Sequence, residues 1–358
     1  MEKCREFLDY FKDHVDPKDQ LPIPVARYNI FPHEIPAEVA YWAHQYLVPM
    51  NCPQILLCPI INTVIRETQK SCTKSPKDCG FDGCGEYTSF NPLKLSSTVI
   101  THINLLCERL LDNAELNEIL NEKSCTLVYK APLHLAKAIK NTRRTMEDRH
   151  VCFSNYHELF DMNEDEPTSF YGIFDGHGGQ DAAVYAAAHL CNHLAKSPDY
   201  PKNIHAAMQQ AFVNTDYSVV GRAYSNNMYS GTTAVVCLYR AKESDLHISW
   251  VGDSQALLVS EGRVCQIVTP HVASMESERN RIRGMGGKVV NWQGSYRVLG
   301  TLALTRAIGM YKQLTFASVV AAGAALETRR TRNSPTTDDR SVEARRRANI
   351  GHDSANAE

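Results

Sequence analysis

Short runs of β-branched and aromatic residues, which begin at Thr126, constrain the fold of this chain more than any other feature. Runs of this kind, bounded by turn residues, are typical of β-strands. Glu261 and Gly262 form a hairpin signal between two of them. The predicted strands are residues 126–130, 149–156, 169–176, 232–240, 246–254, 256–260 and 263–268.

Segments with helical apolar spacing interrupt this series of strands. Two of them, residues 179–195 and 203–222, lie between the strands that contain Ile173 and Thr232. A third, residues 275–285, ends at a pair of glycines, which is a natural helix stop. Successive antiparallel strands with helices inserted in pairs predict an α+β fold, an αββα sandwich of two antiparallel sheets flanked by helices.

The 358-residue chain divides into three segments that differ in composition and in the pattern of their apolar residues. Residues 1–125 predict a mainly helical N-terminal extension, with one amphipathic helix over residues 97–121 and a loop over residues 72–92. Residues 126–309 hold the strands and form the predicted central domain. Residues 310–358 form a tail that is polar and arginine-rich from residue 328, a composition that predicts disorder.

Charge and apolar content limit the partners and the compartment. A net charge of −2 gives no bulk attraction to nucleic acid or to an acidic membrane, so we expect neither partner. The N-terminus lacks the pattern of a signal peptide, and the longest late apolar run is too short to cross a bilayer. We expect a cytoplasmic protein, with nuclear entry as the alternative because the tail holds arginine runs.

The cysteines fit a reducing compartment, because several lie inside apolar runs of the predicted strands and helices. One cluster, formed by Cys58, Cys72, Cys79 and Cys84, raises the alternative of a structural zinc site. Its spacings are wider than the CxxC-like pairs that zinc usually takes. Free cysteines in a loop are the favoured interpretation.

Four short motifs lie at strand ends or tight turns. Each is weak alone, because a DG pair is usually only a turn and a histidine beside glycine is usually a surface residue. In this order and spacing they are specific. The motifs are residues 141–148 (NTRRTMED), residues 174–179 (FDGHGG), residues 231–233 (GTT) and residues 250–254 (WVGDS).

Carboxylates dominate these motifs, namely Glu147, Asp148, Asp175 and Asp253. Like charges brought close together raise each other's pKa unless a cation lies between them. No cysteine or histidine pair accompanies them, and oxygen-only ligands indicate Mg²⁺ or Mn²⁺. Because Gly176 allows close backbone approach, a main-chain carbonyl is a further candidate ligand.

The combination resembles the PPM-type (type 2C) metal-dependent protein serine/threonine phosphatases from residue 127 to residue 309. Residues 278–287 (ERNRIRGMGG) and 297–309 (RVLGTLALTRAIG) extend the resemblance. Residues 141–151 and the WVGDSQ motif are most similar to the subgroup of calmodulin-dependent-kinase phosphatases and partners of PIX exchange factors. Members of that subgroup also carry an N-terminal extension.

The resemblance implies a role for each motif residue. Glu147 and Asp175 would ligate a pair of Mg²⁺ or Mn²⁺ ions, with Asp175 bridging and Gly176 offering its carbonyl. Asp148 lies beside them as a further metal candidate, and Asp253 matches the aspartate of a weaker third metal. Two catalytic residues are implied as well: Arg143 matches the phosphate-holding arginine, and His177 the general acid that protonates the leaving alkoxide.

The implied reaction is direct hydrolysis of phosphoserine or phosphothreonine by a metal-activated water, without a covalent enzyme intermediate. Phosphoprotein substrates, protein kinases among them, are the partners that this resemblance implies. The protein would contribute positioning and charge neutralisation.

The chain departs from the family pattern near its C-terminus. Where the family continues with GD after the TRAIG motif, this chain has Met310, and its later residues lack the family's last two metal-binding carboxylates. Leu299 and Ala273 replace an Asn and a Pro that are usual in the family. The domain is therefore expected to be incomplete at its C-terminus. A pseudophosphatase that binds phosphoproteins or kinases without turnover is the alternative function.

Overall fold

The computed structural model describes residues 2–15, 23, 25–83, 88–121, 131–162, 166–226, 228–309 and 327–332. It confirms an α+β fold with antiparallel sheets flanked by helices, and a mainly helical N-terminal extension. The helices of the extension are α1 (Glu2–His14), η1 (Pro32–Glu34), α2 (Ile35–Leu47), α3 (Gln54–Lys74), α4 (Pro92–Arg109) and α5 (Asn113–Asn121). A short hairpin of β1 (Phe81–Asp82) and β2 (Ser89–Phe90) lies between α3 and α4.

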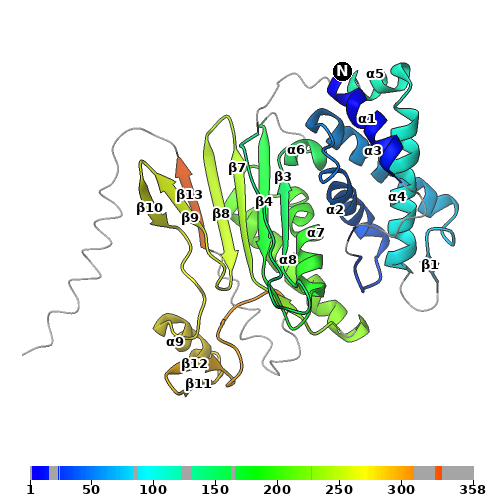
Figure 1. Cartoon of the computed structure of the whole chain (residues 1–358). Coiled ribbons are helices and arrows are strands. Elements are labelled where there is room, and N and C mark those ends of the chain that lie inside the picture. Colours follow the sequence, from blue (N-terminus) through cyan, green and yellow to red (C-terminus); the bar gives the residue numbers. More distant parts are fainter. Residues whose placement is uncertain are drawn as a thin grey trace, which may run out of the picture.

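A five-stranded antiparallel sheet forms the centre of the molecule, in the order β13-β8-β7-β4-β3 (Figure 1). Its strands are β3 (Arg149–Phe153), β4 (Thr168–Phe174), β7 (Ala234–Arg240), β8 (Asp245–Val251) and β13 (Glu327–Arg332). Three further pairs of strands lie outside it: β5 (Gly176–His177) with β6 (Gly231–Thr232), β9 (Leu257–Ser260) with β10 (Arg263–Gln266), and β11 (Val289–Trp292) with β12 (Ser295–Val298).

Helices cover one face of this sheet in two layers. The first layer holds α7 (Asp181–Ala195), which contacts β3 and β4, and α8 (Ile204–Asn226), which packs along α7. In the second layer, α2 packs on α7, so the extension lies directly against the domain that carries the sheet (Figure 1). The remaining helices are α6 (Tyr156–Leu159), which joins β3 to β4, and α9 (Glu276–Gly284), which lies beside the β11–β12 hairpin.

The alternation of buried and exposed side chains along the strands explains which face of the sheet the helices cover. Phe170 and Phe174 of β4 are fully buried and belong to the same apolar core as the residues of α7 and α2. Ile173 points to the opposite face and is 55% exposed. One continuous core therefore joins the extension to the sheet. The boundary that we predicted near residue 125 stays a prediction, because residues 122–130, with the expected strand at 126–130, lie outside the described residues.

Most of the predicted elements are confirmed, and two expectations need correction. The helix predicted over residues 97–121 is two helices, α4 and α5, separated at residues 110–112. Disorder from residue 328 onward is wrong for the first part of the tail, because Glu327–Arg332 forms β13 and pairs with β8. The rest of the predicted tail lies outside the described residues.

The expectation that the cysteine cluster lies in a loop is wrong for Cys58 and Cys72, because both belong to α3. Cys58, Cys72 and Cys79 are buried and form no disulfide among the described residues, and Cys84 lies outside those residues. Across the described ranges, no helix combines the length and the apolar character that crossing a membrane requires.

Candidate active site

Asp175 lies where β4 ends and β5 begins, and its backbone is held on both sides by one residue. The N–H of Thr233 donates to the carbonyl oxygen of Asp175 at 2.9 Å, and the N–H of Asp175 donates to Oγ1 of Thr233 at 3.3 Å. Thr233 belongs to the GTT motif, so two of the four predicted motifs meet here. The aspartate is thereby fixed at the end of the sheet.

The register of the sheet brings the NTRRTMED motif to the same place. Arg149 pairs with Phe174 across the antiparallel β3–β4 ladder. The residues just before β3, Glu147 and Asp148, therefore lie beside Asp175, which directly follows β4. Gly176 is packed so closely here that a Cβ atom on it would lie 2.5 Å from the carbonyl oxygen of Glu147. Only glycine fits at this position.

Electrostatics identify Asp175 as the centre of the carboxylate group. Burial raises the pKa of Asp175 above its usual value, and the charges of Asp148, Asp253 and Glu147 raise it further. The guanidinium of Arg143 acts in the opposite direction and lowers the same pKa. The other four charged residues predicted for the site therefore all act on Asp175, as expected for groups that lie near it.

Asp253 enters the site on a tight turn after β8. Gly252 has a φ of +99°, and a Cβ atom on it would lie 2.6 Å from Cβ of Thr233, so the turn requires glycine. Oγ of Ser254 lies 2.6 Å from Oγ1 of Thr233. Thr233 therefore contacts both the Asp175 strand end and the Asp253 turn, which links the two carboxylates.

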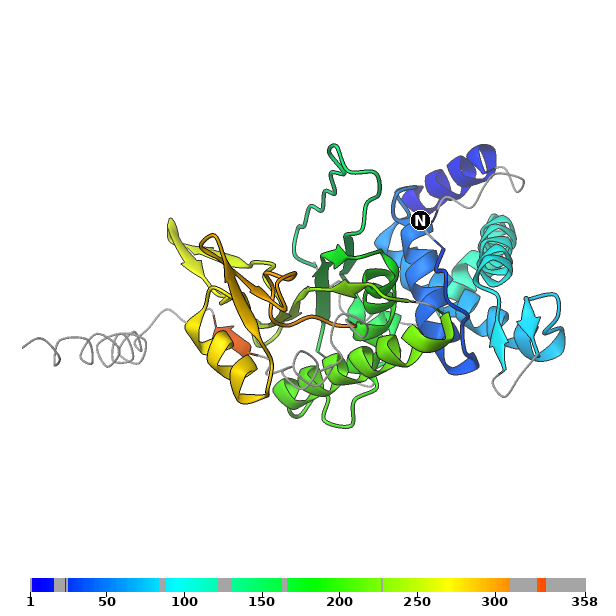
Figure 2. The same cartoon turned by 90° about the horizontal axis from the view of Figure 1, so that it is seen from below.

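The two predicted catalytic residues lie in different environments. Arg143 is exposed, on the segment before β3 that extends out as a long loop (Figure 2). His177 lies in β5 opposite Gly231 of β6, and burial lowers the pKa of its imidazole. A hydrogen bond that the imidazole donates to the backbone of Asp175, together with the charges of Asp253 and Glu147, raises that pKa in part.

The donor chemistry of the site suits a hard divalent cation. Carboxylates that raise the pKa of Asp175 would be stabilised by a cation between them, and oxygen atoms are the ligands that Mg²⁺ and Mn²⁺ prefer. The ligand set is not assembled, however. Across the ranges that the structure describes, no three histidine, cysteine, aspartate or glutamate side chains gather closely enough to hold a metal ion together. The residues fit the metals in kind and supply part of a site.

Two residues near the site were not assigned roles from the sequence. His271, after β10, contacts Gly252 through hydrogen bonds in both directions. Glu278, in α9, accepts hydrogen bonds from Arg281, Thr305 and Arg306. The resemblance over residues 278–287 and 297–309 was the available signal, but it gave no role to individual residues.

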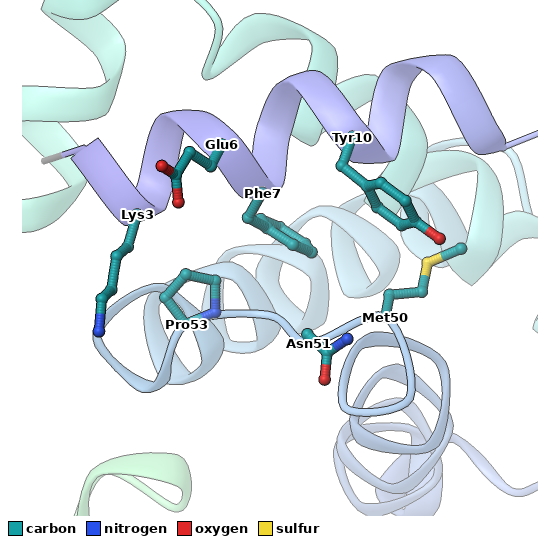
Figure 3. Close-up of a pocket in the computed structure, with 7 residues that line it drawn as sticks. All are labelled: Lys3, Glu6, Phe7, Tyr10, Met50, Asn51 and Pro53. Carbon is teal, nitrogen blue, oxygen red and sulfur yellow. The ribbon is translucent and has the colours of Figure 1, made fainter.

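A surface pocket lies away from the motif carboxylates, in the N-terminal extension. Figure 3 shows it between α1 and the turn that joins α2 to α3, with Phe7 and Tyr10 on one side and Met50 and Pro53 on the other. Its volume is about 370 Å³, and none of the motif carboxylates lines it.

Comparison with known proteins agrees with the motifs. The Protein phosphatase 2C family pattern matches residues 134–337, which continues past residue 309, where we placed the end of the resemblance. Human Protein phosphatase 1E is 34% identical over 296 residues, which cover 82% of this chain and 37% of that protein. Human Protein phosphatase 1F is 40% identical over 181 residues, which cover 51% of this chain and 39% of that protein. Both belong to the subgroup that the NTRRTMED and WVGDSQ motifs indicated.

A solved structure supports the fold. A C. elegans sex determining protein superposes with a TM-score of 0.61 at 21% identity, over 86% of this chain and 73% of that chain. The present chain spans less than half the length of the curated relatives named above. The family match covers more than half of the chain. This chain belongs to the Protein phosphatase 2C family of metal-dependent protein phosphatases.

Proposed function

We propose that this chain is a protein serine/threonine phosphatase that hydrolyses phosphoserine and phosphothreonine in proteins, with Mg²⁺ or Mn²⁺ as its cofactor. The observation that carries the proposal is the set of carboxylates around Asp175, since Asp148, Asp253 and Glu147 all raise the pKa of that one side chain. Glu147, Asp175 and the carbonyl of Gly176 would hold the ions, and Asp253 a weaker one. When bound, the metals would activate water and neutralise phosphate charge.

The protein's own groups would bind and orient the phosphate. Arg143 is exposed and its charge acts on Asp175, which supports a role in which its guanidinium would pair with a phosphate dianion. His177 would donate the proton from its imidazole to the serine or threonine oxygen as it leaves. Substrates would be phosphoproteins, protein kinases among them, in keeping with the subgroup.

A second candidate function is a phosphoprotein-binding protein without turnover. It is favoured by the unassembled ligand set, since no three possible ligands gather closely enough among the described residues. Asp338 and Asp339, the first replacement ligands to consider, lie outside the described residues. In this form, Arg143 would still bind phosphate while little metal-activated water would be available.

One experiment separates the two candidates. Hydrolysis of a phosphothreonine peptide is measured with and without Mn²⁺, beside fluorescence anisotropy of the same peptide. Mn²⁺-dependent turnover that is absent in Asp175→Asn would support the phosphatase. Peptide binding that requires Arg143, with no turnover, would support the binding protein. A chimera that replaces residues 310–358 with the C-terminal portion of a related enzyme is the positive control, and we expect it to turn over much faster.

A further inference from the structure

A buried polar network connects α9 to the Asp253 turn. Its outer end is Glu278, which lies in the first turn of α9 and is 5% exposed. The carboxylate accepts hydrogen bonds from Oγ1 of Thr305 at 2.6 Å, from Nη2 of Arg281 at 2.9 Å and from Nε of Arg306 at 3.0 Å. Burial alone would raise the pKa of Glu278, but the hydrogen bonds from Arg306, Arg281 and Thr305 hold it well below the usual range. The carboxylate is therefore charged and fixed in place.

The network continues inward through the backbone. The N–H of Thr305 donates to the carbonyl of His271 at 2.9 Å. His271 then holds Gly252 from both sides: its N–H donates to the carbonyl of Gly252 at 2.8 Å, and its Nδ1 accepts from the N–H of Gly252 at 3.1 Å. Because Gly252 directly precedes Asp253, these bonds determine where the Asp253 carboxylate enters the site.

The segment that contains Thr305 and Arg306 also contacts β6, the strand that pairs with β5 of the FDGHGG motif. Ile308, two residues after Arg306, forms two backbone hydrogen bonds of 2.9 Å with Thr232. Thr232 pairs with Gly176 in the β5–β6 ladder. Residues 305–308 therefore lie between the two halves of the site, bonded at one end to His271 and at the other end to Thr232.

Glu278 binds two neighbouring residues of this segment at the same time. Its carboxylate binds the side chains of Thr305 and Arg306, which are 0% and 8% exposed. A neutral amide at position 278 would keep the size of the side chain but lose one acceptor and the charge that two arginines neutralise. The segment could then shift, and His271 with it.

We infer that Glu278 is a positioning residue, which acts through Thr305 and His271 to set the Asp253 carboxylate relative to Asp175. The inference rests on the proposed function, because the geometry that Glu278 would set is useful for metal binding. Residues that orient metal ligands from a distance typically change metal affinity by about 10- to 100-fold when they are lost. Through this network, α9 would influence the candidate active site, to which it contributes no motif residue.

The test is Mn²⁺ titration by calorimetry of the full chain and of four variants: Glu278→Gln, Asp253→Asn, the double variant, and Glu276→Gln as a matched control on the exposed side of α9. We expect Glu278→Gln to weaken Mn²⁺ binding by about 10-fold. In the Asp253→Asn background the same change should have no effect, because the network acts through Asp253. A general loss of folding would weaken binding equally in both backgrounds, and that result would overturn the inference.

Backbone hydrogen exchange gives an independent readout. Glu278→Gln should speed exchange of the Gly252 amide, whose hydrogen bond to His271 is loosened, while amides in the middle of β4 keep their protection. Unchanged exchange at Gly252 would overturn the inference. If the parent chain binds no Mn²⁺, the proposed function loses its support, and the exchange result alone decides the role of Glu278. Arg306→Lys, which keeps the charge and loses the planar fork, serves if Glu278→Gln does not fold.

Discussion

Oε1 of Glu38 in α2 lies 2.8 Å from Nε2 of His189 in α7, and both side chains are almost completely buried. The hydroxyl of Tyr28 donates to the same carboxylate oxygen at 2.7 Å. The N-terminal extension and the domain that carries the sheet are therefore joined by buried polar groups as well as by a shared apolar core. Buried polar groups of this kind are costly unless they are paired, so the contact must be maintained for the fold to be stable.

Arg222 of α8 and Glu34 of η1 form a second buried pair across the same interface. The guanidinium also lies over the rings of Phe31 and Tyr185, and its Cζ atom is 4.7 Å from the centroid of each ring. We predict that Arg222→Met lowers the free energy of unfolding by about 3–5 kcal/mol, because Glu34 would keep a buried charge without its partner.

Urea unfolding followed by fluorescence measures this loss. The double variant Arg222→Met with Glu34→Gln should recover part of the stability, because the uncompensated charge is removed. Arg283→Met, at an exposed position of α9, is the control and should change stability by no more than about 0.5 kcal/mol. A single variant as stable as the control would contradict the importance of the pair.

Acid should destabilise the protein through its buried histidines. Burial lowers the pKa of His44 to about 4, and those of His189 and His193 to about 3. Because the folded pKa lies below the unfolded value of 6.5, the stability from each group is present above pH 6.5. It is lost as the pH falls toward the folded pKa values.

Glu38 acts in the opposite direction, since burial raises its pKa from 4.5 to about 7. Its contribution is present at low pH and is lost as the pH rises through that window, so it offsets the histidines in part. We predict a net fall in the free energy of unfolding from pH 6.5 to 4, and a shallower fall in His189→Gln. His205→Gln, at an exposed position of α8, should follow the parent. Equal slopes in all three proteins would rule out this assignment.

The strands of the sheet could be predicted from the sequence because they are short runs of β-branched and aromatic residues bounded by turn residues. β4, β7 and β8 begin and end within a few residues of the predicted bounds, and the Glu261–Gly262 turn joins β9 to β10 as expected. The motif residues at strand ends met for the same reason, since an antiparallel register places the start of β3 beside the end of β4. Short-range patterns were sufficient for these features.

The features that were missed depend on local capping or on distant contacts. The break between α4 and α5 coincides with Asp112, whose Oδ1 accepts a hydrogen bond from the N–H of Ala114 at 2.7 Å and so starts a new helix. β13 is an arginine-rich run that composition alone assigns to disorder, and it is a strand because the edge of β8 pairs with it. The network of Glu278 and Arg306 joins residues 28 positions apart, which no local pattern reveals.

The segment before β3 exposes apolar side chains in alternation. Leu133 is 103% exposed, Leu135 95% and Ile139 69%, which is a strand-like spacing without a partner in the described part of the chain. Burying one such side chain contributes about 1.5–3 kcal/mol, so contact between two chains at this segment would be favourable. We predict concentration-dependent self-association of the chain.

Analytical ultracentrifugation of the triple variant Leu133→Thr, Leu135→Thr, Ile139→Thr tests this prediction. Its sedimentation should lose the concentration dependence, while its melting temperature stays close to that of the parent because the replaced side chains are exposed. Lys137→Thr, in the same segment, is the matched control. Association that persists unchanged in the triple variant would place the contact elsewhere.

Asp175 is the residue on which divalent-metal binding should depend most. Its side chain is influenced by the charges of Asp148, Asp253 and Glu147, and its backbone is fixed by Thr233. In Asp175→Asn the negative charge is lost and one neutral oxygen remains, while the backbone hydrogen bonds are kept, so the fold should be preserved. Mg²⁺ and Mn²⁺ bind weakly to few protein ligands because they give up water reluctantly. We therefore predict that Asp175→Asn removes the Mn²⁺ affinity of the chain. Calorimetric titration measures it, with Asp199→Asn, at an exposed aspartate between α7 and α8, as the control that should bind like the parent. Equal affinity in Asp175→Asn and the parent would show that the metal site lies elsewhere in the chain.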